Sequence, residues 1–340
     1  MKRFIVPALA AAFALGFAGS ALASYIPHLV VSQAGTKTTI HVTIAKEDDA
    51  TLKLTIYAPA AAPATLTQAP GTPIGTVTAQ VNAKAISPDA ILPLTGIVQV
   101  ADGTAAPLAQ AATQCTGIAT HAATWVLVLT AAGQTLQVPA WVDPTTGTET
   151  AFGAGKLTVC LPSPDVPQSA GGAAFGAKLL DVNFTVDGIF AASTAPLAIW
   201  PSVFTPYVPG TATPNPAGTV LALGIESQPT LTFAAKVSKT RKATFSGKIS
   251  AAGVGAPGIA VTILDGSKKV ASATTGATGS YAASAKLKKG THSLRAKVAA
   301  KDTDVTAQGC AAAPAGAPKC VSATAAGVAL TSATVKVKVK

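Results

Sequence analysis

The chain has 340 residues and a formal net charge of +11, from 25 Lys and Arg against 14 Asp and Glu. Its apolar fraction of 49% is largely Ala spread among Thr, Gly and Pro, so this composition does not indicate a membrane protein. The length suits two or three domains.

The first 23 residues are typical of a secretory signal peptide. Lys2 and Arg3 precede an apolar run over residues 4–18, and the small-residue triplet Ala21-Leu22-Ala23 follows. The apolar run is shorter than the roughly 20 residues that span a bilayer, so we expect cleavage before Ser24 rather than anchoring. The mature protein is therefore expected outside the cell or at its surface, without a membrane span.

Charge divides the mature chain into two parts. Residues 24–234 hold 6 Lys and Arg against 11 Asp and Glu, a net of −5, whereas residues 235–340 hold 17 against 3, a net of +14. The composition changes near Pro229. We expect an acidic domain over residues 24–228 and a basic domain over residues 229–340.

Both parts are predicted to be nearly all β. After the signal peptide the Ala-rich stretches are interrupted by Pro or Gly, and no long segment shows a helical period. The acidic part carries about ten predicted strands, which suit one large β-sandwich or two small ones. They include residues 38–45, 51–58, 75–83, 95–102, 123–131, 134–143, 156–162, 178–190 and 218–225.

The segments 38–45 and 51–58 alternate strictly and flank the acidic stretch 46–49. This pattern predicts a hairpin with an acidic tip, with Ile40, Val42 and Ile44 facing the core and His41 facing solvent.

The basic part shows short strands bounded by Gly, Pro or Asp, which predict a C-terminal β-sandwich. In the last strand Val335, Val337 and Val339 share one face, and Lys336, Lys338 and Lys340 share the other. The other strands are predicted over residues 243–250, 258–265, 268–275, 279–287 and 291–300.

The stretches "SGKISAAGVGAPGIAVTILDG" and "TTGATGSYAASAKLKKGTHSLRAKV" resemble the immunoglobulin-like and carboxypeptidase-regulatory-like modules of secreted bacterial proteins. The resemblance covers about 100 residues and implies a sandwich fold, with Tyr281 and His292 in structural roles. Gly276 stands where the family often has Asp, and Thr278 where it often has Asp or Asn, which does not favour calcium binding there. The matching residues are Gly247, Pro257, Gly258, Val261, Gly279, Tyr281, Leu287, Gly290 and His292.

Most of residues 25–224, with stretches such as "VPAWVDPTTG" and "TPYVPGTATPNPAGTV", are similar to uncharacterised secreted proteins of high-GC Gram-positive bacteria. That resemblance implies an exported protein of an actinobacterial host and no particular activity.

The four cysteines predict disulfides, because an even number in an exported chain is typical of a disulfide framework. Three pairings are possible, and domain order favours Cys115 with Cys160 and Cys310 with Cys320. A metal site is not expected, because these cysteines are isolated and no His lies near them. Residues 301–323 exceed the usual short turn of the module, and we expect them to form an inserted, disulfide-closed surface loop, either functional or merely resistant to proteolysis.

Catalytic residues are scarce, and we expect no enzyme and no cofactor. His121 could in principle meet Asp143 and a Ser, but no nucleophile or metalloprotease motif accompanies it. Asp181 and Asp187 lie roughly 20 Å apart along one strand, too far apart for glycoside hydrolysis.

Two kinds of binding remain. Trp200, Phe204 and Tyr207 lie in a Pro-rich stretch, where they could stack on sugars or pack inside the protein. The basic domain suits an anionic envelope polymer or polysaccharide rather than nucleic acid, because the chain is exported and no aromatics alternate with its lysines. Edge protection and docking on the acidic domain are the alternatives. The residues expected to bind the polyanion are Lys286, Lys288, Lys289, Arg295, Lys297, Lys336, Lys338 and Lys340.

Overall fold

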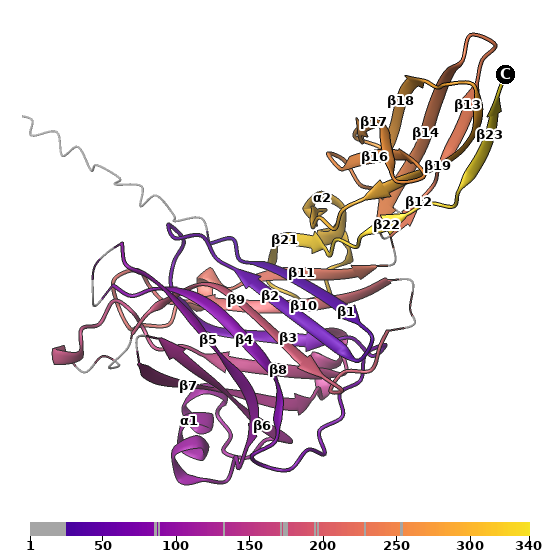
Figure 1. The fold of residues 1–340 in the computed structure, drawn as a ribbon. Helices are drawn as coiled ribbons and strands as arrows, with labels where there is room; N and C mark the ends of the chain where they lie inside the picture. Colours follow the sequence, from indigo (N-terminus) through magenta and orange to yellow (C-terminus); the bar gives the residue numbers. More distant parts are fainter. Residues whose placement is uncertain are drawn as a thin grey trace, which may run out of the picture.

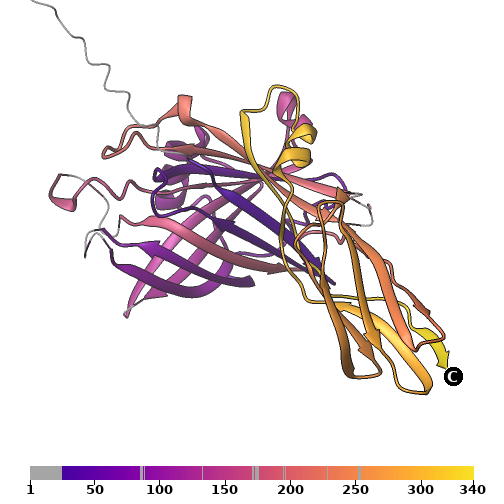
Figure 2. The ribbon, with the colours of Figure 1, turned by 90° about the horizontal axis from the view of Figure 1, so that it is seen from above.

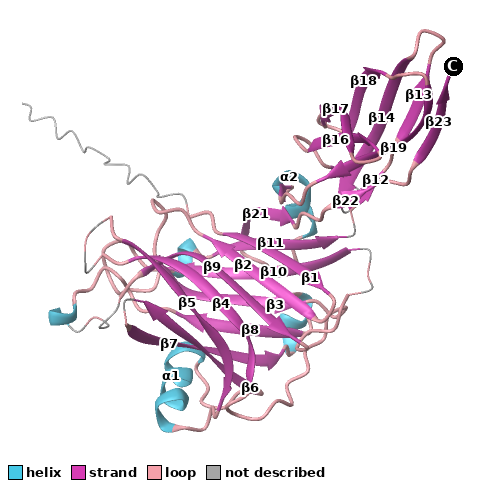
Figure 3. Cartoon of the chain, viewed as in Figure 1, coloured by secondary structure: helices cyan, strands magenta, loops and turns pink. Residues whose placement is uncertain are grey.

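The computed structural model describes residues 25–340, apart from residues 85, 86, 88, 132, 171, 173–175, 194, 196, 228, 252 and 253. The expected signal peptide lies outside the described residues. The protein is nearly all β, as the sequence predicts (Figure 3). Among the residues that the structure describes, no helix has the length and apolarity to cross a membrane.

Within the described residues, 13 strands form one large sheet. Their order across the sheet is β1-β2-β9-β4-β5-β6-β7-β8-β3-β10-β11-β21-β20. The strands are β1 (His28–Ala34), β2 (Lys37–Thr43), β3 (Thr51–Ala58), β4 (Pro73–Asn82), β5 (Ile91–Ala101), β6 (Ala123–Ala131), β7 (Gln134–Pro144), β8 (Gly155–Cys160), β9 (Lys178–Asp187), β10 (Leu197–Pro206), β11 (Val220–Ser227), β20 (Thr303–Asp304) and β21 (Lys319–Ala325).

The sheet curls until its two ends pack against each other (Figure 1). Among the described strands β1 pairs with β2 alone. Its Leu29 and Val31 nevertheless lie against the backbone of Gly224 on β11, where an added Cβ would come within 3.1 Å of both side chains. Ser322 of β21 donates a 2.5 Å hydrogen bond to the carbonyl oxygen of Pro27, just before β1. The curled sheet therefore surrounds one large apolar core.

The period-two pattern predicts the strands but not all of their neighbours. The expected hairpin of residues 38–45 with residues 51–58 is wrong: β2 pairs with β1 and β9, and β3 pairs with β8 and β10. The acidic stretch between them crosses from one part of the sheet to another. Lys178 holds it there, since its buried ammonium group donates to the carbonyl oxygens of Lys46 and Asp48.

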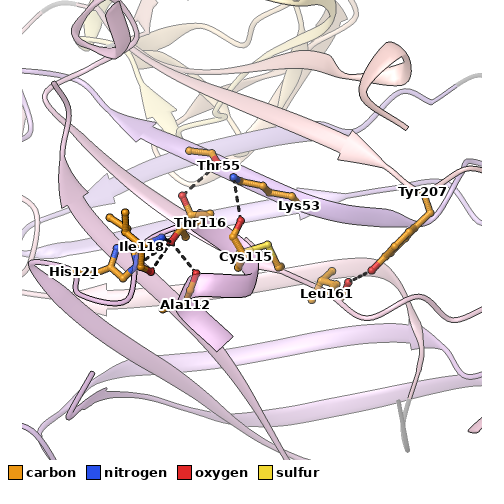
Figure 4. The surroundings of a disulfide bond; sticks show 11 residues. Lys53, Thr55, Ala112, Cys115, Thr116, Ile118, His121, Leu161 and Tyr207 are labelled. Atoms are coloured by element: carbon orange, nitrogen blue, oxygen red, sulfur yellow. Dashed lines mark hydrogen bonds between the residues drawn. A yellow bond between two sulfur atoms is a disulfide. The ribbon is translucent and has the colours of Figure 1, made fainter. Parts of the chain in front are cut away.

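The helix α1 (Ala106–Thr116) is a feature that the sequence analysis missed. Pro107 occupies its first turn, and Gly117 ends it in the left-handed conformation with a φ of 84°, which suits glycine. Cys115 in its last turn is bonded to Cys160 of β8, which fixes the helix to the sheet (Figure 4). The other helical segments are α2 (Thr306–Gly309) and the 3₁₀ segments η1 (Gly147–Ala151), η2 (Gln168–Ala170), η3 (Pro216–Gly218) and η4 (Cys310–Ala312).

The basic part forms the expected two-sheet sandwich, which we call the module. Its two sheets pack face to face over apolar clusters that include Phe245, Ile263 and Leu294. One sheet contains β12 (Thr230–Leu231), β13 (Ala234–Val237), β14 (Lys242–Ala251), β15 (Val254–Gly255) and β18 (Ser280–Lys286). The other contains β16 (Ala260–Asp265), β17 (Lys268–Thr274), β19 (Gly290–Val298), β22 (Leu330–Thr331) and β23 (Val335–Val339).

The residues that carry the resemblance to immunoglobulin-like modules have structural roles. The hydroxyl of Tyr281 donates to the carbonyl oxygen of Thr232 at 2.7 Å, which ties β18 to the start of the module. Burial raises the pKa of Tyr281 to about 12. Gly247 faces the same contact, where a Cβ would lie 2.0 Å from that carbonyl oxygen, so a side chain at this position would break it.

The segment 301–323 is not the surface loop that was expected. It contributes β20 and β21 to the large sheet, and β21 pairs in parallel with β11. Val305, Ala323 and Ala325 pack on Leu221, Leu223 and Ile225 of β11, forming a second apolar cluster. This segment therefore joins the acidic part, and the chain passes between the two parts three times, while the module projects away from the large sheet (Figure 2).

Both disulfides have the pairing that domain order favours, Cys115–Cys160 and Cys310–Cys320. They span 45 and 10 residues.

We predict that replacing both cysteines of the first pair by Ser lowers the free energy of unfolding by about 4 kcal/mol, because the unfolded chain gains loop entropy. The corresponding loss for the second pair is about 3 kcal/mol.

Urea unfolding of each double variant measures these losses. A Cys115→Ser/Cys160→Ser protein as stable as the wild type would contradict the expected contribution of that bridge.

Candidate functional site

The residues expected to bind a polyanion lie on different faces of the module. Lys286 ends β18 and lies opposite Lys242 on the outer face of its sheet. Lys288 and Lys289 are exposed in the turn that follows, and Lys340 is exposed at the end of the chain. The remaining four, Arg295, Lys297, Lys336 and Lys338, belong to the other sheet.

These four residues form one line, which we call the basic row. In the pairing of β19 with β23, Lys336 lies opposite Ser293 and Lys338 lies opposite Thr291. Residues directly opposite each other on antiparallel strands share a face, so all four side chains point to the outside of the sandwich. The positions 291, 293, 295 and 297 repeat every two residues, so successive cations are offset by about 7 Å along the strands.

The strand pattern explains why these side chains are on the outer face. The apolar residues that alternate with them, such as Leu294, Ala296 and Val339, are buried in the sandwich. Lys297, Lys336 and Lys338 are exposed, as the sequence predicts for the lysines of the last strand. Within the described part of the chain, no cation of the basic row forms an ion pair.

The outer face around the basic row carries no carboxylate from the paired strands that the structure describes. Opposite Arg295 and Lys297 lie Leu264 and Thr262 of β16, and Lys269 of β17 lies opposite Leu264 in turn. The potential over this face is therefore positive, and its charge is available to an external partner.

Asp265 is tied down at the end of β16. The Nδ1 atom of His292 lies 2.6 Å from its carboxylate, and the Ser293 N–H donates to the other oxygen at 2.9 Å. The hydrogen bonds to Asp265 and to the carbonyl oxygen of Lys288 raise the pKa of His292. Burial lowers this pKa, but by less than the hydrogen bonds raise it. Burial raises the pKa of Asp265, but its bonds from His292 and Ser293 outweigh this effect and hold the pKa below its usual value. The pair closes the turn between β18 and β19 and has a structural role.

The aromatic residues proposed to stack on sugars are buried, which corrects that prediction. Trp200 and Phe204 belong to β10 and are fully buried in the core, rather than lying in an irregular stretch. The ring of Phe190 meets Trp200 edge-on at 5.2 Å. Tyr207 is also buried, and its hydroxyl donates to the carbonyl oxygen of Leu161 at 2.7 Å (Figure 4). None of the three offers a ring face to a ligand.

His121 does meet Asp143, as the sequence allowed. Its other partner is Thr116 rather than a Ser (Figure 4). The Nδ1 atom lies 2.7 Å from the Asp143 carboxylate, and Nε2 lies 3.1 Å from the Thr116 hydroxyl. The His121 side chain is only 1% exposed, and the same hydroxyl donates to the carbonyl oxygen of Ala112 one helical turn earlier. This arrangement fastens the end of α1 to β7 and occupies both ring nitrogens of His121.

Among the residues that the structure describes, no three His, Cys, Asp or Glu side chains gather as a metal site would require. The carboxylates of Asp181 and Asp187 are used separately: Asp181 bonds His41 at 2.8 Å, and Asp187 accepts from Thr36 at 2.6 Å. His41 is therefore held by a carboxylate on the outer face of the large sheet.

We predict that Trp200→Ala lowers the free energy of unfolding by about 3 to 5 kcal/mol, because it empties a fully buried indole site. Trp200→Phe should lower the free energy of unfolding by less, since a ring remains against Phe190. Urea unfolding followed by circular dichroism measures both losses. A Trp200→Ala protein of wild-type stability would show that this ring is not part of the packed core.

We also predict that the stabilising effect of His292 depends on pH. Because folding raises its pKa, the contribution is complete below about pH 6.5, the ordinary His value, and is lost as the pH rises through the folded-state pKa. The contribution of Asp265, whose pKa is lowered, is present above about pH 3.9 and is lost as the pH falls. The difference in stability between wild type and His292→Gln should thus be largest near about pH 5 to 6.

Thermal unfolding at several pH values measures that difference. Thr291→Gln, an outward-facing change one residue earlier, is the control. Its difference in stability from the wild type should not depend on pH. A His292→Gln difference that stays constant between about pH 5 and 9 would refute the proposed ion pair.

Comparisons with known proteins do not assign this chain to a family. No family model matches it, and no curated protein matches it. Among solved structures, it is similar to the T6 backbone pilin of serotype M6 Streptococcus pyogenes, at 8% identity and a TM-score of 0.25, over 92% of this chain and 52% of the pilin. A tetra-tandem repeat from the extending region of a large adhesion protein matches at 14% identity and a TM-score of 0.25, over 93% of this chain and 74% of that one. The chain spans about half the length of the pilin, and a TM-score of 0.25 transfers neither fold nor function from either protein.

Proposed function

We propose that this chain is a non-enzymatic exported protein whose basic module binds anionic polymers of the cell envelope, such as teichoic acids or acidic polysaccharides. The observation that carries the proposal is the basic row, a line of four cations on one sandwich face without an acidic neighbour on the paired strands described. A linear polyanion presents charges in sequence, so it can contact such a line along its length.

The charge of the module supports this function. Residues 235–340 carry a net of +14 and only three acids. Asp302 and Asp304 belong to the segment 301–323 that joins the large sheet, so Asp265, which lies opposite Leu294 of β19, is the acid of the described module strands. Asp265 is engaged by His292, and Asp304 by Thr306, whose hydroxyl donates to it at 2.6 Å. These acids therefore do little to neutralise the outward-facing lysines.

Two alternatives explain the lysines without a partner. Among the described strands β23 pairs with β19 alone, so Lys336 and Lys338 could simply protect an exposed sheet edge. The basic module could also dock on the acidic domain of its own chain. Against docking, the module projects from the large sheet, and the described residues show no ion pair between the basic row and that sheet (Figure 2).

Export is consistent with the two disulfides, which persist in oxidising compartments. The alternative function, sugar stacking in the N-terminal domain, loses the aromatic residues on which it depended, because Trp200, Phe204 and Tyr207 are buried.

Retention of the mature protein on isolated cell walls and on heparin resin tests the proposal. We predict retention at low salt and release as salt rises, because exposed charges are screened over about 8 Å at physiological ionic strength. Replacing Lys297, Lys336 and Lys338 together by Gln should weaken binding about tenfold, at roughly 0.5 kcal/mol for each exposed contact.

A matched variant separates the basic row from net charge alone. Lys236, Lys242 and Lys248 are exposed on the outer face of the other sheet, and replacing them by Gln removes the same charge. This control should bind more tightly than the first variant. Equal weakening would show that the basic row is not the site, and a wild-type protein that is not retained at low salt would refute polyanion binding.

A further inference from the structure

The interior of the curled sheet contains a cavity that the proposed function does not use. Its volume is about 460 Å³, within the range of small-molecule sites in proteins. It lies at the end of the sheet where β4 ends and β5 begins, where β6 turns into β7, and where β8 ends and β9 begins. Each strand from β2 to β9 contributes to its wall, for example through Ala79, Leu94, Leu129, Val138 and Phe184.

The wall is almost entirely aliphatic. Among the described residues that line the cavity there is no Asp, Glu, Lys, Arg or His, and Phe184 is the single aromatic ring. Such a surface cannot hold water by hydrogen bonds, and apolar cavities of this kind stay dry unless an apolar molecule fills them. Protein cores seldom leave voids larger than a water molecule, so a space of this size suits a ligand better than a packing defect.

The polar residues near the cavity lie at the β6–β7 turn. Gln134, Thr135 and Gln137 are exposed at the β6–β7 turn, where Thr135 and Gln137 alternate with the core-facing Leu136 and Val138. The cavity-lining residues Ala79, Leu94 and Leu129 are buried. Leu92 and Leu161 are half-buried between these two regions. The cavity thus runs from a solvent-exposed rim beside neutral polar residues to an apolar interior, which suits a molecule with one polar end and one hydrocarbon end.

The size of the cavity indicates how long that hydrocarbon part is. A water-sized group takes about 30 Å³, and a methylene group is similar in size, so the space holds roughly 15 such groups. The small number of rings in the wall favours a flexible aliphatic chain over a flat aromatic molecule, which proteins often hold by ring stacking.

We propose that this cavity binds the single aliphatic chain of a fatty acid or of a lipid with one acyl chain, with its polar end at the Gln134–Gln137 turn. This activity is separate from polyanion binding by the module, since it uses only residues of the large sheet. It makes the N-terminal domain an acyl-chain binding domain.

Isothermal titration of the mature full-length protein, freed of bound lipid on a hydrophobic resin, tests the proposal. The probes are tetradecanoic acid and a lysophospholipid with the same chain, both below their micelle concentrations. We expect one molecule of ligand to bind per chain, and hexanoic acid to bind at least tenfold more weakly. Binding of both probes would show that the chain alone is recognised, and binding of one would show that the mouth also selects the head group.

Filling the cavity supplies the decisive variant. Ala79 points into the cavity from β4, and its neighbour Thr78 is exposed on the opposite face. Ala79→Phe should weaken acyl-chain binding at least tenfold while the protein keeps its fold by circular dichroism, because the added ring occupies existing space. Thr78→Phe adds the same ring on the exposed face of β4 and should bind the acyl-chain probes as tightly as the wild type does. Val81→Phe, at a half-buried lining position, is used in place of Ala79→Phe if that variant does not fold.

Three outcomes would overturn the proposal. The first is that the folded wild-type protein binds neither acyl-chain probe. The second is that a folded cavity-filling variant binds as tightly as the wild type, which would place the ligand elsewhere. The third is that pyrene, an aromatic probe, binds more tightly than tetradecanoic acid, which would contradict an aliphatic ligand. Because none of these measurements involves cell walls or heparin, their failure is distinct from a failure of polyanion binding.

Discussion

The parallel pairing of β21 with β11 joins the two chemically different parts of this chain. After β11 the chain leaves the large sheet, builds most of the module, and returns at residues 303–325 before it leaves again for β22 and β23. The returning strands bury Ala323 and Ala325 against Leu223 and Ile225 and cover the edge of the sheet that β11 would otherwise expose. Three passages of the chain, rather than one flexible linker, therefore hold the module to the sheet.

This arrangement separates the two surfaces for which we propose functions. The apolar cavity lies among β2–β9, and the basic row lies on β19 and β23 of the module. The Cys310–Cys320 bridge and the bond from Ser322 to Pro27 belong to the segment between them. An attachment that is held in this way keeps the basic row exposed instead of allowing it to fold back on the acidic sheet.

The sequence predicts strands and faces well because both depend on local alternation. The last strand shows this, since its valines face the core and its lysines face solvent. Alternation does not say which strand lies beside which, because a two-residue period specifies a face and not a neighbour. For this reason β2 and β3 were expected to pair although other strands separate them, and residues 301–323 were expected to form a loop although they complete the large sheet. The sequence predicts that Lys336, Lys338 and Lys340 share one face of the last strand, but the alignment of Lys336 and Lys338 with Arg295 and Lys297 depends on the register of β19 with β23. The cavity leaves no trace in the sequence, because Ala79 and Leu94 would look the same in a filled core.

Amide hydrogen exchange of the mature protein tests the pairing of β21 with β11 most directly. We expect the amides of residues 319–325 to exchange as slowly as those of residues 220–227, because both strands belong to one hydrogen-bonded sheet. Exchange of residues 319–325 as fast as that of exposed turns, with β11 still protected, would contradict this account of how the two parts are joined.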